Sequence, residues 1–157
     1  MRHAKSDWKT NALTDHDRPL NKRGRQDAPV IAEKLLERQW CPEVVISSDA
    51  LRTQETWQRM KKIFPIRPEI IFTPQLYHGN VDDIQAMVST ISNEKQTVMV
   101  LGHNPGWESA VTFLSGEHHS MTTANAALMT HSGEDWRSII QLEETWRLVR
   151  ILRPKEL

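Results

Sequence analysis

Three short runs of apolar residues stand out against an otherwise polar chain. They cover residues 42–48 (PEVVISS), 69–72 (EIIF) and 96–103 (QTVMVLGH), and each contains β-branched side chains. Their hydrophobicity is nearly continuous and does not alternate, as is typical of strands covered on both faces of a parallel sheet. The pattern therefore predicts three buried parallel strands.

The segments between these runs have a helical period. A helix with one buried face is predicted over residues 48–64, because its apolar side chains recur at spacings of three and four: Ala50, Thr53, Trp57, Met60 and Phe64. Three further helices are expected: over residues 26–40, which include Pro29, from the capping residue Asn80 onward with Asp83 in its first turn, and from Pro105 to Gly116.

The last quarter of the chain has a different pattern. Residues 123–132 and 145–154 are predicted to be strands on either side of a turn at 133–136, toward the edge of a sheet. Strands that alternate with helices predict an α/β fold, here a three-layer sandwich with a mostly parallel central sheet flanked by helices. A length of 157 residues fits one domain over residues 1–157.

Composition and charge narrow the classes of function. Twenty basic and twenty acidic residues cancel, so no global field favours nucleic acid or an anionic membrane, and any anion site must be local. The single cysteine, Cys41, excludes an internal disulfide framework. The chain has no secretory leader pattern and no apolar run of the roughly 18 residues that span a membrane, so we expect a cytoplasmic protein.

Basic and imidazole side chains follow the predicted strands where ligands gather in α/β sheets. Arg52 follows the first strand and His103 ends the third, while Arg2 and His3 would take the same place if a strand preceded them. Arginine forks match phosphate oxygens, and an imidazole attacks phosphorus when its other ring nitrogen is held. Ser48 is expected to cap the helix that carries Arg52, adding backbone donors to the same anion. These residues together indicate metal-independent phosphoryl transfer.

Other interpretations of these side chains exist. A single arginine or histidine is usually a solvated surface residue, and only the group of four favours catalysis. His118, His119 and His131 suggest a metal site, but adjacent histidines lack the spacing of a helical metal pair, and no metal is expected.

The motifs resemble those of the histidine phosphatase (phosphoglycerate mutase-like) superfamily, in particular its SixA-like phosphohistidine phosphatase branch. RHAKS is similar to the Arg-His-Gly signature, with Ala4 in the glycine position, and DRPLNKRG (17–24) is similar to the loop that follows. SSDALRTQET and LGHNPGWE resemble the second arginine and second histidine motifs. The resemblance covers nearly the whole chain.

The resemblance implies roles for individual residues. His3 would be the nucleophile that becomes phosphohistidine, and Arg2, Arg52 and His103 would form the phosphate pocket. Arg18 and Asn104 are further expected substrate-binding residues. No cofactor is implied, and the implied partner is a phosphorylated protein of the histidine-phosphotransfer type, in signal transduction, or else a small phosphate ester.

Two departures from the family pattern matter. Members usually carry a strand before the Arg-His pair, and only Met1 precedes it here. We therefore expect a hole in the sheet, and a misassigned start or a missing upstream segment as its origin. Members that act on small esters present a carboxylic acid to the leaving group, but the corresponding loop reads TPQLYHGNVDD, with Tyr77 and His78 and no evident acid. Asp82 and Asp83 fit the start of a helix better.

The missing acid favours phosphohistidine as the substrate, because imidazole leaves more easily than an alkoxide. Two alternatives remain open from the sequence. One is a small-molecule phosphomonoesterase, and the other is a phosphate-binding or interaction module without turnover.

Overall fold

The computed structural model describes residues 1–12 and 14–156. It contains a parallel sheet of three strands in the order β2-β1-β3 and an antiparallel pair formed by β4 and β5. The strands are β1 (Val44–Ser48), β2 (Glu69–Thr73), β3 (Val98–Leu101), β4 (Ala126–Thr130) and β5 (Arg147–Leu152). The helices are α1 (Lys22–Glu37), α2 (Leu51–Met60), α3 (Val81–Val88), α4 (Gly106–Ser115) and α5 (Trp136–Ile139), with short 3₁₀ turns at Pro74–Leu76 and Pro154–Glu156.

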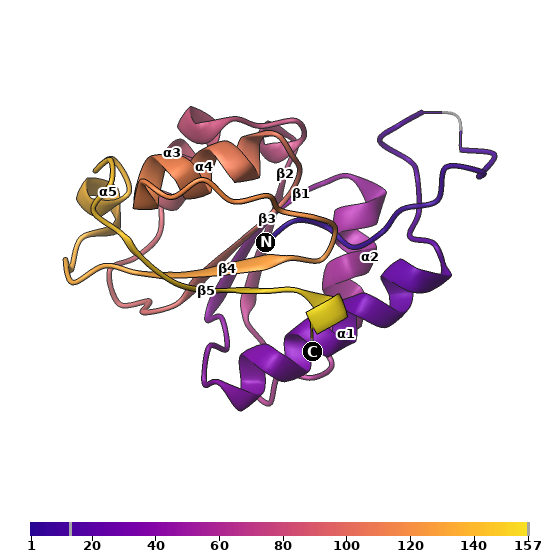
Figure 1. Ribbon diagram of the computed structural model, residues 1–157, viewed down its shortest axis with the longest axis horizontal. Helices are drawn as coiled ribbons and strands as arrows, with labels where there is room; N and C mark the ends of the chain where they lie inside the picture. The colour runs from indigo at the N-terminus through magenta and orange to yellow at the C-terminus, as the bar shows by residue number, and fades with distance from the viewer. Residues whose placement is uncertain (13, 157) are drawn as a thin grey trace.

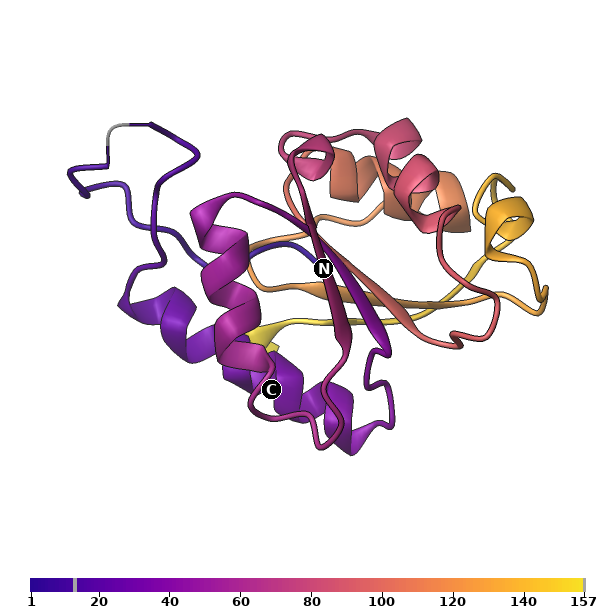
Figure 2. The ribbon, with the colours of Figure 1, turned by 180° about the vertical axis from the view of Figure 1, so that it is seen from behind.

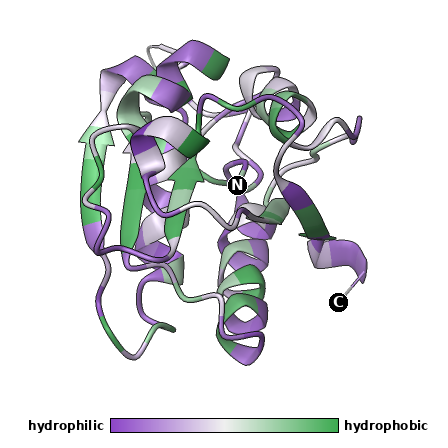
Figure 3. Ribbon diagram, turned by 90° about the vertical axis from the view of Figure 1, so that its left-hand side faces the viewer, coloured by the Kyte–Doolittle hydropathy of each residue, from purple (hydrophilic) through white to green (hydrophobic). Residues whose placement is uncertain are grey.

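Helices cover both faces of the parallel sheet (Figures 1 and 2). Successive residues of β1 point to opposite sides, so Val45 packs in the apolar cluster under α1 and α2, while Val44 and Ile46 pack in the cluster under α3, α4 and α5. The strands accordingly include the most hydrophobic ribbons of the molecule (Figure 3). This confirms the predicted three-layer α/β sandwich with its three parallel strands. β1 is buried along its whole length as predicted, but the prediction of burial is wrong for β2, which has no fully buried residue because it lies at the edge of the sheet.

Most predicted element boundaries agree with the structure, and one helix does not. Asn80 caps α3 in a reciprocal capping box with Asp83, and α4 ends at Gly116, whose φ is 73°. The helix predicted over 26–40 begins earlier, because the Asn21 side chain accepts from the Gly24 amide and starts α1 at Lys22. The segment predicted as a turn at 133–136 leads directly into the short helix α5.

The expected hole in the sheet is present between β3 and β4. The chain before α1 pairs with β3 through a single-residue parallel bridge, between Arg2 and Gly102, at the carboxyl end of that strand. Farther along, a cavity of about 1030 Å³ is lined by β3, by β4 and by Met1. The N-terminus therefore lies at the centre of the molecule, beside β3 and β4 (Figures 1 and 2).

Candidate active site

The first residues of the chain are held in place by backbone hydrogen bonds. His3 N donates to Gly102 O at 3.0 Å, and Gly102 N donates to Met1 O at 3.1 Å. On the other side, Arg2 N donates to Asn125 O at 3.0 Å and Ala124 N donates to His3 O at 2.9 Å. These bonds fix the Arg2-His3 pair between the end of β3 and the approach to β4, so the pair is not a fraying terminus.

His3 and His103 lie next to each other because the N-terminal segment pairs with the end of β3, at Gly102, and His103 is the next residue of the chain. Their ring centroids are 5.2 Å apart. His3 Nδ1 donates to Ala4 O at 2.7 Å, since a carbonyl can only accept, and this leaves Nε2 without a proton on the neutral ring. His103 Nε2 bonds to the Ser48 hydroxyl at 2.8 Å.

Both imidazoles are neutral in the folded protein near pH 7. Burial lowers the pKa of His3 to about 3; the backbone bond to Ala4 acts in the opposite direction, and the charges of Arg52, Arg2 and Arg18 lower the pKa further. Burial also lowers the pKa of His103 to about 2, and the neighbouring His3 and Arg52 act in the same direction. A neutral His3 presents a free lone pair on Nε2.

Three arginines converge on the two histidines. Arg52 comes from the first turn of α2, Arg18 from the loop before α1, and Arg2 from the N-terminal segment. Several buried nitrogens of these residues have no hydrogen-bond partner among the described residues: Arg2 Nε, Arg18 Nε, Arg18 Nη1, Arg52 Nε and His103 Nδ1. Buried donors are normally paired, so this cluster is prepared for an anion that accepts from several directions.

Asp15 is the functional candidate that sequence reasoning missed. Its Oδ2 accepts from Arg52 Nη2 at 3.1 Å and from the Tyr77 hydroxyl at 2.6 Å, and its backbone O accepts from Arg52 Nη1 at 2.7 Å. Its Oδ1 lies 3.4 Å from Arg18 Nη1. The available signal was its place three residues before Arg18, the spacing at which two side chains in a helical turn meet.

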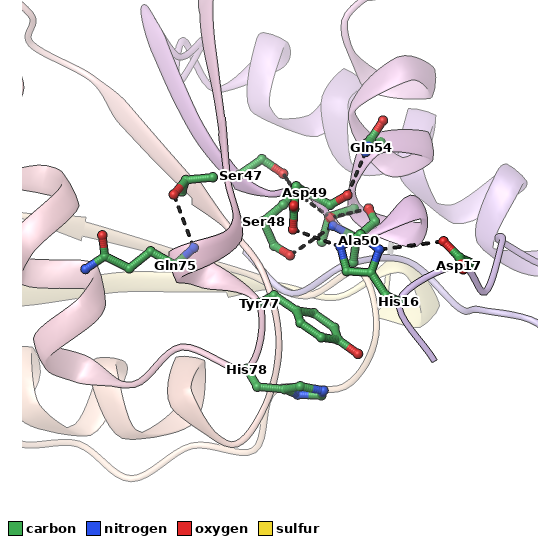
Figure 4. Close-up of polar contacts among 12 residues, drawn as sticks. His16, Asp17, Ser47, Ser48, Asp49, Ala50, Gln54, Gln75, Tyr77 and His78 are labelled. Atoms are coloured by element: carbon green, nitrogen blue, oxygen red, sulfur yellow. Dashed lines mark hydrogen bonds and ion pairs between the residues drawn. The ribbon is translucent and has the colours of Figure 1, made fainter. Parts of the chain in front are cut away.

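Tyr77 and His78 form a wall beside Asp15. Both project from the segment after β2 toward the loop that carries His16 (Figure 4), and the Tyr77 and His16 rings are 4.8 Å apart. His78 Nε2 lies 3.6 Å from Asp15 Oδ2, and the rings of Tyr77 and His78 lie 5.5 and 5.8 Å from the ring of His103. The segment 73–83, in which the sequence showed no evident acid, thus contacts the carboxylate of Asp15, which comes from a different loop.

Asn104 lies beside the pocket but its amide is already engaged. Its Nδ2 donates to Glu108 Oε1 and to Met121 O, both at 2.8 Å, while its Oδ1 is buried without a partner among the described residues. Arg2 Nη1 donates to the same Met121 carbonyl at 2.8 Å. Glu108 and Asn104 therefore hold the segment that orients Arg2.

One sequence-based expectation near the site needs correction. Ser48 does not cap α2, because Ala50 is the N-cap residue and makes no side-chain cap bond; the Ser48 hydroxyl accepts from Ala50 N and pairs with His103. Close by, Trp8 is 73% exposed and lies over the guanidinium of Arg18, 3.5 Å from ring centroid to Cζ.

The described residues contain no group of three His, Cys, Asp or Glu side chains arranged to hold a metal ion. His119 instead lies 3.1 Å from Glu117, and His131 packs against Trp146. In the part of the chain that the structure describes, no helix is long and apolar enough to cross a membrane.

The chain resembles known proteins both in sequence and in fold. Residues 1–133 match the family model of the histidine phosphatase superfamily (branch 1). An uncharacterized chloroplastic protein of Arabidopsis thaliana is 35% identical over 165 residues, which span 98% of this chain and 76% of that protein. An uncharacterized protein of Mycobacterium leprae is 30% identical over 119 residues, 74% of this chain and 71% of that protein.

Solved structures with the same fold include two SixA proteins. The protein histidine phosphatase SixA in complex with tungstate superposes with a TM-score of 0.83 at 25% identity, over 99% of this chain and 96% of that one. A protein from Agrobacterium tumefaciens assigned as phosphohistidine phosphatase SixA gives 0.82 at 27% identity, over 98% and 95%.

Proposed function

Since the chain belongs to the histidine phosphatase superfamily, we propose that it hydrolyses phosphohistidine on a partner protein through a covalent intermediate on His3. The observation that carries the proposal is the cluster of unpartnered buried donors around a neutral His3. The SixA-like fold supports the same substrate class, and tungstate in one SixA structure is a tetrahedral oxyanion like phosphate.

His3 is the nucleophile in this proposal. Its Nδ1 is held by Ala4 O, which directs the lone pair of Nε2 toward phosphorus. A bond forms between Nε2 and phosphorus as the bond from phosphorus to the substrate nitrogen breaks. Water then attacks the phosphorylated His3, and inorganic phosphate leaves as the neutral imidazole returns.

Arg2, Arg18 and Arg52 bind the phosphoryl oxygens, and His103 Nδ1 faces the same group. The nitrogens offered are those that lack partners in the structure. Donors that are held before the substrate arrives stabilise the charge that spreads over the equatorial oxygens in the transition state. The proposed phosphate site therefore needs no metal ion.

The choice of phosphohistidine rests on the groups near the mouth of the pocket. A hydrogen bond from Tyr77 and the charges of Arg52 and Arg18 keep the pKa of Asp15 below its usual range, so Asp15 is a carboxylate and not a proton donor near pH 7. An alkoxide leaving group needs a donor that typically contributes about 10²–10⁴ in rate. An imidazole needs much less help, because it protonates near neutral pH.

The experiment compares kcat/KM for a phosphorylated histidine-phosphotransfer domain, 4-nitrophenyl phosphate and a sugar phosphate with one preparation. The proposal expects the phosphohistidine protein to exceed the sugar phosphate by about 10²–10⁴, the aryl phosphate to fall between, and all three activities to survive EDTA. His3→Ala should abolish turnover, and vanadate should inhibit. Equal rates on the sugar phosphate would favour the small-molecule phosphomonoesterase, and no phosphate release from any substrate would favour a binding module.

A further inference from the structure

The carboxylate of Asp15 occupies an unusual place for an anion. It lies among the arginines that are prepared for phosphate, within 3.1 Å of Arg52 Nη2 and 3.4 Å of Arg18 Nη1. A carboxylate close to a bound phosphate repels it. Asp15 would therefore weaken phosphate binding if orienting Arg52 were its only use. The substrate itself offers a second use.

The two carboxylate oxygens of Asp15 are not equally engaged. Oδ2 accepts from Arg52 and from Tyr77, whereas Oδ1 has only the long contact with Arg18 among the described residues. The Asp15 side chain is 44% exposed, compared with 4% for Arg52 and 11% for Arg18. Oδ1 therefore retains accepting capacity on a side chain that a substrate can reach.

Asp15 lies on the His103 side of the pocket. Tyr77 and His78, which contact its Oδ2, both pack against the ring of His103. The charge of Asp15 also acts on His103, raising its pKa against the larger lowering by burial. An in-line displacement by His3 places the leaving group opposite the attacking nitrogen, toward the outer part of the pocket.

We propose that Asp15 is a specificity-determining residue that accepts the ring N–H of the substrate imidazole through Oδ1. This inference rests on the proposed function, because it concerns the leaving group of phosphohistidine. The two nitrogens of an imidazole lie on opposite sides of the ring, so one bears phosphorus while the other bears the proton that Asp15 accepts as a hydrogen bond.

The step balances without an added acid. His3 Nε2 forms a bond to phosphorus, and the bond from phosphorus to the substrate nitrogen breaks with its electron pair staying on that nitrogen. The proton on the other ring nitrogen stays there, held by Asp15, so the ring departs as neutral imidazole. A phosphate ester has no such N–H, and its leaving oxygen gains negative charge near a carboxylate, which is unfavourable.

Substitution of Asp15 by Asn separates this role from the positioning of Arg52. The probes are free phosphohistidine, which has no protein docking surface, and 4-nitrophenyl phosphate. Asp15→Asn should lower kcat/KM for phosphohistidine by about 10- to 100-fold, the value of one charge-assisted hydrogen bond. The same variant should lower kcat/KM for the aryl phosphate much less than for phosphohistidine, because the aryl leaving group has no N–H for Asp15 and a repulsive charge is removed.

Matched variants complete the experiment. Asp17→Asn, in the same loop, should leave both values within twofold of the wild type, and Tyr77→Phe, which keeps the Asp15 charge, should keep the wild-type ratio of the two substrates. Asp15→Ser is the second variant if Asp15→Asn fails to fold, and it should shift the ratio in the same direction. Equal losses on both substrates would overturn the inference and make Asp15 a positioning residue for Arg52. A wild-type protein that hydrolyses only the aryl phosphate would instead overturn the proposed function.

Discussion

At the scale of single residues, the neutral state of His3 and His103 lowers the stability of the folded protein at acidic pH. Their folded pKa values of about 3 and about 2 lie below the ordinary histidine value of about 6.5, because both rings are buried beside arginines. Between these values the unfolded chain binds more protons than the folded chain. Folding stability therefore rises with pH in that window, and it falls as the pH drops below about 6.5.

The first prediction concerns this pH dependence. Each histidine should contribute a loss of about 2 kcal/mol in the free energy of unfolding between pH 7.5 and pH 5, at about 1.36 kcal/mol per pH unit below 6.5. His3→Gln and His103→Gln should each lose about 2 kcal/mol less than the wild type over the same interval in urea titrations. His118→Gln, at an exposed position, is the control and should keep the wild-type difference. If the unfolding free energy of the His3 and His103 variants depended on pH as in the wild type, these rings would be protonated as readily in the folded protein as in the unfolded chain.

The second prediction concerns the guanidinium of Arg52. Its Nη1 and Nη2 both hold Asp15, and its Nε is free for phosphate. Arg52→Lys replaces this planar fork with one ammonium, so kcat/KM for an aryl phosphate should fall by about 100-fold. Arg59→Lys, on an exposed position of the same helix, should change it by less than twofold. Similar values for the two variants would mean that only the charge of Arg52 matters.

At the scale of elements, the catalytic segment depends on a close approach to α1. A Cβ at Gly24 would lie 2.2 Å from Lys5 O and 2.9 Å from Lys5 N, and both are backbone atoms. Asn21 N also donates to Lys5 O at 2.9 Å. The start of α1 is therefore packed directly on the segment that follows His3.

The third prediction tests this contact. Gly24→Ala should destabilise the protein by about 2 kcal/mol as the two backbones separate, although alanine favours a helix by about 1 kcal/mol over glycine. It should also lower phosphatase activity, because His3 moves with Lys5. Gln26→Ala, on the exposed side of α1, should stay within about 0.5 kcal/mol of the wild type in the same urea titration. A more stable Gly24→Ala would show that helix propensity outweighs the contact.

At the scale of the whole molecule, a large space lies between the two sheets. The cavity of about 1030 Å³ separates β3 from β4, and both strands present an edge to it. The Met1 amino group is buried at one end, donates to Val100 O at 2.6 Å, and has a pKa lowered by burial to about 5. The missing strand that the family resemblance led us to expect remains a prediction, and this space would accommodate it.

The fourth prediction follows from that space. A chain extended before Met1 by six alternating valine and isoleucine residues should gain about 3 kcal/mol of unfolding free energy through burial and pairing with β3. A glycine-serine extension of equal length is the control, because it also moves the charged amino group away from Met1. Equal stability of the two extended chains in urea would show that no strand forms between β3 and β4.

Much of the fold follows from local pattern. The runs that became β1, β2 and β3 could be recognised from their apolar and β-branched residues, and Asn80 and Gly116 act through bonds to residues only a few positions away. Such signals are present in a short window of sequence. The start of α1 was missed because the cap at Asn21 competes with Pro29, a residue that usually marks the first turn of a helix.

The sequence by itself determined the family of this protein, through motifs that carry two histidines and a set of arginines, and it indicated the chemistry that we propose. Only the tertiary structure decided which side chains touch them. Asp15 meets Arg52 and Tyr77 across 37 and 62 positions of the chain, and Ser48 meets His103 across 55. The reason is physical, because these contacts arise from the order of the strands, β2-β1-β3, which no local pattern of residues specifies.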